Sequence, residues 1–200
     1  MPLKRSISYT RDQVAAIADC QNEMHGLSTK IALAAGLRAH ELLTLRLARE
    51  RPADGQPSAK EKFSVREGVL YTVIGKFGFT QRGGNWLCRH VLLPSSLAAE
   101  LETLRLAEPK DLVDRGTRYS MLYAIGGGQR WSNSFSQASN AALGRSNGAN
   151  GLRQVYVTPM LKSAWGSCSG VVLLSPMHLS LSLKKWAVLH LGLSSVNWFK

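Results

Sequence analysis

The stretch GLRAHELL, residues 36–43, is the most informative segment of this sequence for the fold. It lies inside the apolar run IALAAGLRAHELLTLRL, residues 31–47, whose composition is typical of buried helix. Arg38 interrupts that run, and three interpretations of it are open. The side chain extends along apolar surface with its charged end in water, it pairs with Glu41 three residues later, or it is a buried cation that binds an anionic ligand. The remainder of the chain favours the third interpretation.

The charge of the chain predicts a polyanionic partner. The 200 residues include 25 Lys and Arg against 13 Asp and Glu, a formal net charge of +12 at pH 7. Nucleic acid is the first candidate for such a basic protein, and an anionic membrane surface is the second. Every acidic residue lies at or before Asp114, so the basic residues after it have no acidic counterpart. This asymmetry is unusual, because protein surfaces normally mix charges of both signs.

The spacing of cysteine and histidine argues against a metal site or a disulfide framework. Cys20, Cys88 and Cys168 are odd in number and widely separated, which is typical of a reducing compartment. The five histidines show no pair with metal-ligand spacing. No apolar run reaches the roughly eighteen residues of a membrane span, and the first residues contain no apolar signal segment. We therefore expect a cytoplasmic protein with no metal, no cofactor and no membrane partner.

Periodicity and capping residues predict helices in the first quarter of the chain. Thr10 and Gln13 form a capping-box pattern at the start of the first helix. Ser28 can cap the second helix, which Gly36 would end. The three helices are predicted over residues 12–21, 28–35 and roughly 39–49. A polar segment rich in Pro and Gly follows them and is predicted to be a loop.

The pattern then changes to that of strands. Residues 63–93 alternate between apolar and polar side chains and are rich in Val, Ile, Tyr and Phe. Turn signals at Gly68 and Gly83 divide them into three strands, which predicts a small antiparallel meander. Two more helices are predicted over residues 95–107 and 132–143, the latter capped by Ser132 and ended by Gly144. Helices around a short sheet indicate an α+β domain.

Three sequence elements recur together in one known family. Residues 36–43 match the pattern Gly-Leu-Arg-x-x-Glu-Leu-Leu, and residues 75–78 form a Gly-Lys-x-Gly turn within the meander. Residues 150–154, Asn-Gly-Leu-Arg-Gln, stand where the family has His-x-Leu-Arg-His. In order and spacing these elements resemble the catalytic domain of the tyrosine recombinases, the phage-integrase family. The stretch GGGQRWSNSFSQASNAALGRSNGANGLR, residues 126–153, is similar to the subgroup carried by integrating mobile elements.

The resemblance implies a fold and a division of the chain. The fold would be α+β, a mainly helical recombinase-like catalytic domain with a small antiparallel three-stranded sheet. An N-terminal extension would cover residues 1–8, and an incomplete integrase-like catalytic domain residues 9–162. Residues 163–200 would form an aberrant and poorly ordered tail, because they lack both an amphipathic period and acidic residues. A frameshift in the coding sequence is one hypothesis for that tail.

The resemblance also implies a chemistry, which is site-specific DNA strand breakage and rejoining, as in DNA integration and recombination. Arg38 and Arg153 would neutralise the charge on a phosphodiester of double-stranded DNA, to which forked guanidiniums are suited. Lys76, at the hairpin tip, would act as general acid toward the leaving oxygen. A histidine would assist proton transfer, and a tyrosine near the C-terminus would attack the phosphorus. No cofactor or metal is needed, and other recombinase protomers are expected partners.

Four departures from the family pattern predict that this copy does not cleave DNA as a lone chain. Asn150 stands in the histidine position and cannot transfer a proton. Gln154 replaces the following histidine, and Pro159 would interrupt a helix. No tyrosine occurs after Tyr156, so the C-terminal nucleophile is absent. We therefore expect weak, salt-sensitive DNA binding without strand cleavage.

Two other hypotheses remain open at the level of sequence. The chain could be a small basic nucleic-acid-binding accessory protein with no catalytic ancestry. In that case Arg38, Lys76 and Arg153 would lie far apart, whereas the recombinase hypothesis predicts that they converge on one basic face. The chain could also fail to make a stable product, because an apolar disordered tail promotes aggregation.

Overall fold

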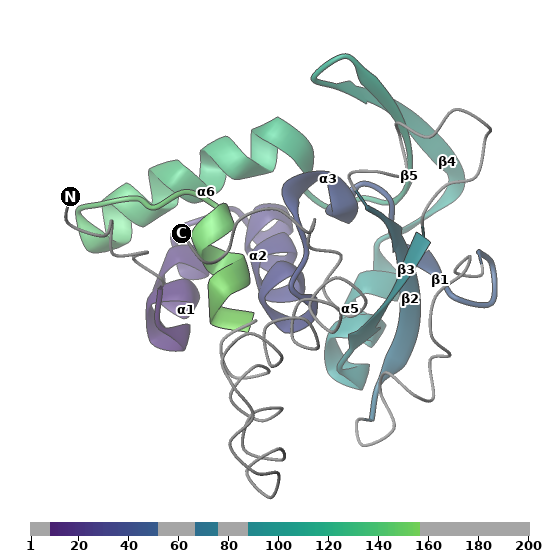
Figure 1. The fold of residues 1–200 in the computed structure, drawn as a ribbon, viewed down its shortest axis with the longest axis horizontal. Helices are drawn as coiled ribbons and strands as arrows, with labels where there is room; N and C mark the ends of the chain where they lie inside the picture. The colour runs from purple at the N-terminus through teal and green to yellow at the C-terminus, as the bar shows by residue number, and fades with distance from the viewer. Residues whose placement is uncertain (1–8, 52–66, 76–87, 157–200) are drawn as a thin grey trace, which may run out of the picture.

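The computed structural model of the chain describes residues 9–51, 67–75 and 88–156 (Figure 1). Its helices are α1 (Arg11–Asp19), α2 (Glu23–Ala35), α3 (Ala39–Leu42), α5 (Ser95–Thr103) and α6 (Gly128–Leu143), followed by helical residues 150–156. Its strands are β1 (Arg46–Leu47), β2 (Val69–Ile74), β3 (Cys88–Leu93), β4 (Arg105–Asp114) and β5 (Thr117–Tyr123). The fold is α+β, as the sequence predicts. In Figure 1, α1, α2 and α6 lie on one side and strands β1–β3 with α5 on the other, with α3 between them.

Local capping residues set the limits of the first two helices. The predicted capping box of α1 is confirmed, because the Gln13 amide donates to Thr10 Oγ1 at 3.2 Å and the Thr10 amide donates to Gln13 Oε1 at 2.9 Å. The predicted start of α2 at Ser28 is wrong. Asn22 caps the helix, six residues before the predicted cap, and its side chain accepts from the His25 amide at 2.8 Å. Ser28 lies buried inside the helix. Gly36 ends α2 in the left-handed conformation, as expected.

The predicted third helix stops much earlier than residue 49. α3 ends at Leu42, and the chain then turns into the short strand β1, which pairs with β2. Four leucines in this segment are buried, at positions 42, 43, 45 and 47. On one continuous helix they would point in divergent directions, so a single face could not bury them all. A turn followed by a strand places all four in the core.

The small antiparallel sheet is confirmed, but its first strand differs from the prediction. The strand order is β1-β2-β3, with Leu47 opposite Tyr71 and Tyr71 opposite Val91. The segment predicted as the first strand, residues 63–66, lies outside the described residues, as does the hairpin tip that carries Lys76.

A second sheet, formed by the β4–β5 hairpin, is absent from the sequence-based prediction. The helix predicted over residues 95–107 ends at Thr103, and the chain continues as β4. Arg115 and Gly116 both have positive φ, 49° and 75°, as two-residue hairpin turns require. The hairpin extends away from the helices and sheet in Figure 1. Its tip nevertheless contacts α6, because Asp114 Oδ1 accepts a hydrogen bond from the Gln129 amide at 2.9 Å.

This contact explains why α6 begins at Gly128 rather than at the predicted Ser132. The N-cap residue, Gly127, has no side chain, and Asp114 supplies the capping oxygen from the hairpin. Further along, α6 buries Trp131 and Phe135 completely, and Trp131 Nε1 donates to Thr29 Oγ1 at 3.1 Å. α6 ends at Gly144 as predicted. None of the helices in the described ranges combines the length and apolar content that a membrane span needs.

Candidate anion-binding site

Arg38 lies at the turn between α2 and α3, and the local sequence determines that turn. Gly36 reverses the chain with φ 61°, and Arg38 then takes an extended conformation as the N-cap residue of α3. The Arg38 amide donates to Glu41 Oε2 at 2.8 Å. This bond is the backbone half of a capping box, in which the acidic residue three positions into a helix accepts from the N-cap amide. Arg38 is therefore presented from a rigid turn rather than from the middle of a helix.

The carboxylate of Glu41 is fully buried and bound by an arginine from the sheet. Arg89, on β3, donates from Nε to Glu41 Oε1 at 3.1 Å and from Nη2 to Glu41 Oε2 at 2.7 Å. Arg89 Nη2 also reaches the carbonyl oxygen of Gly36 at 3.4 Å. This arginine is itself buried. It therefore fixes the α2–α3 turn to the sheet by a two-point ion pair.

Arg153, from the helical residues 150–156, completes the group. Burial lowers the pKa of Arg153 to about 10; Glu41 opposes that shift, whereas Arg38 and Arg89 add to it. Burial likewise lowers the pKa of Arg38, with Glu41 opposing and Arg89 adding to the shift. These mutual effects place Arg38, Glu41, Arg89 and Arg153 in one electrostatic unit, which we name the arginine cluster. Both arginines remain charged at neutral pH, because the guanidinium group is not deprotonated in proteins.

The arginine cluster carries more positive than negative charge. Burial raises the pKa of Glu41, but Arg89, Arg153 and the Arg38 amide outweigh that effect and lower it to about 2. Glu41 is therefore ionised at neutral pH and contributes one negative charge against three guanidiniums. Burial favours the neutral form of His40, because it lowers the pKa of that imidazole below its ordinary value. An anion that enters this group would meet an excess of two positive charges in a partly desolvated setting, where electrostatic attraction is strong.

The structure brings together two of the four residues that the sequence singled out. Arg38 and Arg153 share the arginine cluster. Asn150 is exposed, one helical turn before Arg153. Lys76 and Pro159 lie outside the described residues. Arg38 and Arg153 act on each other electrostatically, while the roles expected of Arg38, Arg153 and Lys76 stay predictions.

Arg89 is the member of the cluster that sequence reasoning missed. The alternation of residues in CRHVLL, residues 88–93, could have indicated that Arg89 is buried. Arg89, Val91 and Leu93 point to one face of β3, and all three are buried. An arginine on the core face of a strand needs a buried acidic partner. Glu41, inside the most apolar stretch of the chain, is the matching acid.

The tyrosines of this chain hold structural positions, with one exception beside the cluster. Tyr71 and Tyr123 both donate to Glu102 Oε1, at 2.7 and 2.8 Å, and Tyr9 lies within hydrogen-bonding distance of Ser139 at 3.2 Å. The exception is Tyr156, which is half-buried. Its ring packs so closely on Gly36 that a Cβ at that position would overlap it.

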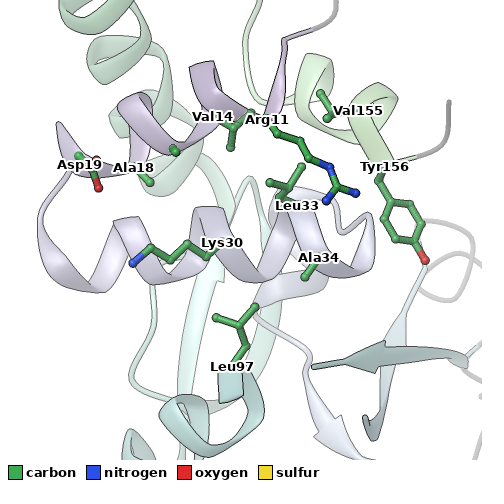
Figure 2. Close-up of a pocket in the computed structure, with 11 residues that line it drawn as sticks. Arg11, Val14, Ala18, Asp19, Lys30, Leu33, Ala34, Leu97, Val155 and Tyr156 are labelled. Carbon is green, nitrogen blue, oxygen red and sulfur yellow. The ribbon is translucent and has the colours of Figure 1, made fainter. Parts of the chain in front are cut away.

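A separate groove of about 510 Å³ lies between α1, α2 and the end of the described chain (Figure 2). Its floor is apolar, with Val14, Leu33 and Val155 among the lining residues. In Figure 2 the Arg11 side chain extends over the groove toward Tyr156. Arg38, Arg89 and Arg153 do not line this groove, so it is distinct from the arginine cluster.

Comparison with protein-family models found no match to this sequence, and comparison with curated proteins found none either. Within the described ranges, His, Cys, Asp and Glu side chains form no group of three that could hold a metal ion.

Proposed function

We propose that the arginine cluster binds a phosphodiester of double-stranded DNA, and that the chain is a cleavage-deficient protein of the tyrosine-recombinase type. The observation that carries the proposal is the meeting of Arg38 and Arg153, which are distant in sequence, around the buried Glu41 carboxylate. The positive charge grouped in the cluster is suited to an anionic ligand. The net charge of +12 on the whole chain favours a polyanion over a small phosphate compound.

The chemistry of the cluster suits binding better than cleavage. Two guanidiniums can hold the two non-bridging oxygens of a phosphodiester and keep their charge throughout the physiological pH range. Asn150 can donate a hydrogen bond near Arg153 but cannot transfer a proton. A nucleophilic tyrosine after Tyr156 is absent from the sequence. A second recombinase protomer that contributed a tyrosine would be needed to complete strand breakage.

The grouping of Arg38 with Arg153 favours this proposal over a basic accessory protein without catalytic ancestry. For such a protein, phosphate contacts can be spread over the surface, and two arginines from distant segments need not lie in one electrostatic group. The mixed α+β architecture with a short antiparallel sheet agrees with either hypothesis.

Fluorescence anisotropy with a labelled DNA duplex, measured over a series of salt concentrations, tests the proposal. Arg38→Gln and Arg153→Gln should each weaken binding about 10- to 100-fold, because each removes a charge-assisted contact worth about 1.5–3 kcal/mol. Each should also reduce the slope of log affinity against log salt by about one.

Arg118→Gln is the matched control. Arg118 is exposed on β5, and its ion pair with Asp111 is long, at 3.9 Å. The same change of charge at this position should alter affinity by less than about threefold, since exposed pairs and isolated surface charges contribute little. If Arg38→Gln and Arg153→Gln behave like Arg118→Gln, the cluster is not the DNA site and the proposal fails.

A further inference from the structure

We propose that the groove between α1, α2 and residues 155–156 is a docking site for an amphipathic helix of a partner protein. The apolar side chains of that helix enter the groove, and acidic side chains flank them. This inference goes beyond the proposed function and does not depend on it, because no residue of the arginine cluster lines the groove. It rests on the apolar floor, the length of the groove and the charges at its rim.

The floor of the groove is built from apolar side chains of neighbouring helices. On α1, Val14 and Ala18 are four residues apart and therefore lie on the same face of the helix. On α2, the adjacent residues Leu33 and Ala34 both line the groove, and Leu97 of α5 adds a third element. Leu33, Ala34 and Leu97 are only half-buried. Covering this surface with apolar side chains of a partner is favourable, because binding removes it from water.

The groove follows α1 for about two turns. Its lining residues on this helix run from Arg11 to Asp19, and at about 1.5 Å per residue this stretch is about 12 Å long. A helix that lies in a groove inserts side chains at positions i, i+3 or i+4, and i+7, which span about 10.5 Å. The length of the groove therefore suits one such set of anchoring side chains.

Two cations lie at the rim of the groove. Arg11 is the first residue of α1 and Lys30 lies on α2, and both are exposed. Neither side chain forms an ion pair within residues 9–51, 67–75 and 88–156. In Figure 2, Arg11 extends over the groove toward Tyr156. Asp19 is the one acidic residue among the described residues that line the groove. Carboxylates beside the anchors of a partner helix complement this rim.

The charge of the chain argues against a second copy as the occupant of the groove. Each copy carries a formal net charge of +12, so two copies repel one another. Residues 115–200 also contain no acidic side chain that could pair with Arg11 or Lys30. A partner protein with an acidic amphipathic helix has neither disadvantage.

Binding of three fluorescent peptides to the full chain, measured by anisotropy without DNA, tests the proposal. The first peptide is a helix with leucines at positions i, i+3, i+4 and i+7 and glutamates beside them. The second has lysine in place of each glutamate, and the third has serine in place of each leucine. The first should bind at least about tenfold more tightly than the others, because they lose the charge complementarity or the apolar anchors. Equal binding of the first peptide and either of the others, or no binding of the first, would overturn the proposal.

Ala15→Glu and Ala16→Glu locate the binding site with a matched pair of variants. Both alanines are exposed on α1, but only Ala15 lines the groove. Ala15→Glu should weaken binding of the glutamate peptide at least about fivefold, because it places a like charge in the groove. Ala16→Glu makes the same change of net charge and helix propensity and should alter binding less than about twofold. Equal effects would show that the peptide is held only by the general positive charge of the chain, and the proposal would be wrong.

Circular dichroism checks that both variants are folded, and a second pair repeats the comparison without adding a side chain to the groove. Arg11→Gln removes a positive charge at the rim and should weaken binding of the glutamate peptide about threefold. Arg130→Gln removes an exposed charge from α6, outside the groove, and should have less than half that effect. If Arg11→Gln is no weaker than Arg130→Gln, the rim does not bind the acidic side chains and the proposal fails.

Sedimentation velocity of the unmodified chain, Ala15→Glu and Ala16→Glu decides between a partner helix and a second copy. The proposal expects the same sedimentation for all three proteins, because the groove does not join copies of the chain. A dimer that Ala15→Glu dissociates and Ala16→Glu leaves intact would make a second copy the occupant and overturn the proposal.

Discussion

Arg89 and Glu41 form a buried two-point ion pair that joins β3 to the start of α3, with Nη2 and Oε2 2.7 Å apart. The two side chains are 48 residues apart in the sequence. Removing one partner of such a pair leaves a charge without compensation and typically costs about 3–5 kcal/mol. The Arg118–Asp111 pair on the exposed hairpin is the opposite case, since a surface pair at 3.9 Å contributes little. The first prediction follows from the buried pair.

Glu41 should make the protein sensitive to acid in a defined pH window. Its pKa in the folded protein is about 2, below the ordinary value of 4.5. A carboxyl whose pKa is depressed by folding stabilises the fold above its unfolded pKa, and that stabilisation is lost as pH falls toward the folded pKa. Between pH 6 and pH 3, the stability advantage of the unmodified protein over Glu41→Gln should shrink by about 2 kcal/mol.

Urea unfolding at several pH values, followed by circular dichroism, measures this difference. Comparison with Glu41→Gln cancels the contribution of the other carboxylates, and glutamine retains an oxygen that can accept from Arg89 and from the Arg38 amide. A gap between the two proteins that stays constant from pH 6 to pH 3 would contradict the depressed pKa.

Gly36 should tolerate alanine far less well than Gly144, although both end helices with positive φ, 61° and 69°. Alanine in the left-handed region costs about 1 kcal/mol at either position. At Gly36 the added Cβ would also overlap the Tyr156 ring, whereas no atom lies within 4 Å at Gly144. We expect a loss of about 1 kcal/mol for Gly144→Ala and at least about 2 kcal/mol for Gly36→Ala. Equal shifts in urea midpoint would show that Tyr156 does not pack on Gly36.

Asp114 should stabilise α6 from outside the helix. Its Oδ1 accepts from the Gln129 amide at 2.9 Å, and the N-cap position itself is Gly127, which has no side chain. Asp114→Ala should therefore lower the free energy of unfolding by about 1 kcal/mol, the usual cost of losing a cap.

The control for that change is Asp111→Ala, on the same strand. Asp111 is exposed and its ion pair with Arg118 is long, at 3.9 Å, so its loss should stay within about 0.5 kcal/mol. Amide hydrogen exchange gives a second readout, since Asp114→Ala should speed exchange in the first turn of α6 and leave its last turn unchanged. If amide exchange in the first turn of α6 is no faster in Asp114→Ala than in Asp111→Ala, the hairpin does not cap this helix.

A nicked suicide DNA substrate should give no covalent adduct with this protein. The hydroxyls of Tyr71 and Tyr123 are engaged by Glu102, and Tyr9 is bonded within the core. Tyr156, the tyrosine nearest the arginine cluster, is half-buried against Gly36. We expect salt-sensitive gel shifts but no band of protein linked to DNA on a denaturing gel. An adduct that mass spectrometry maps to Tyr156, and that Tyr156→Phe abolishes, would make this protein an enzyme with a rearranged nucleophile.

The sequence by itself determined the features that depend on neighbouring residues. The capping box at Thr10 and Gln13 and the helix-ending glycines at positions 36 and 144 follow from local hydrogen bonds and backbone conformation. Arg38 and Arg153 were singled out through the resemblance to a known family. Their roles in binding DNA stay predictions.

Only the tertiary structure decided the features that depend on distant partners. β1 forms because β2 offers hydrogen bonds and the core accepts four leucines, and α6 begins early because Asp114 reaches it from a hairpin. Arg89 becomes part of the site because the sheet sets it against Glu41, whose two carboxylate oxygens it binds. Local patterns cannot reveal such pairings, because a buried charge or an open helix end is satisfied by whichever group the fold brings to it.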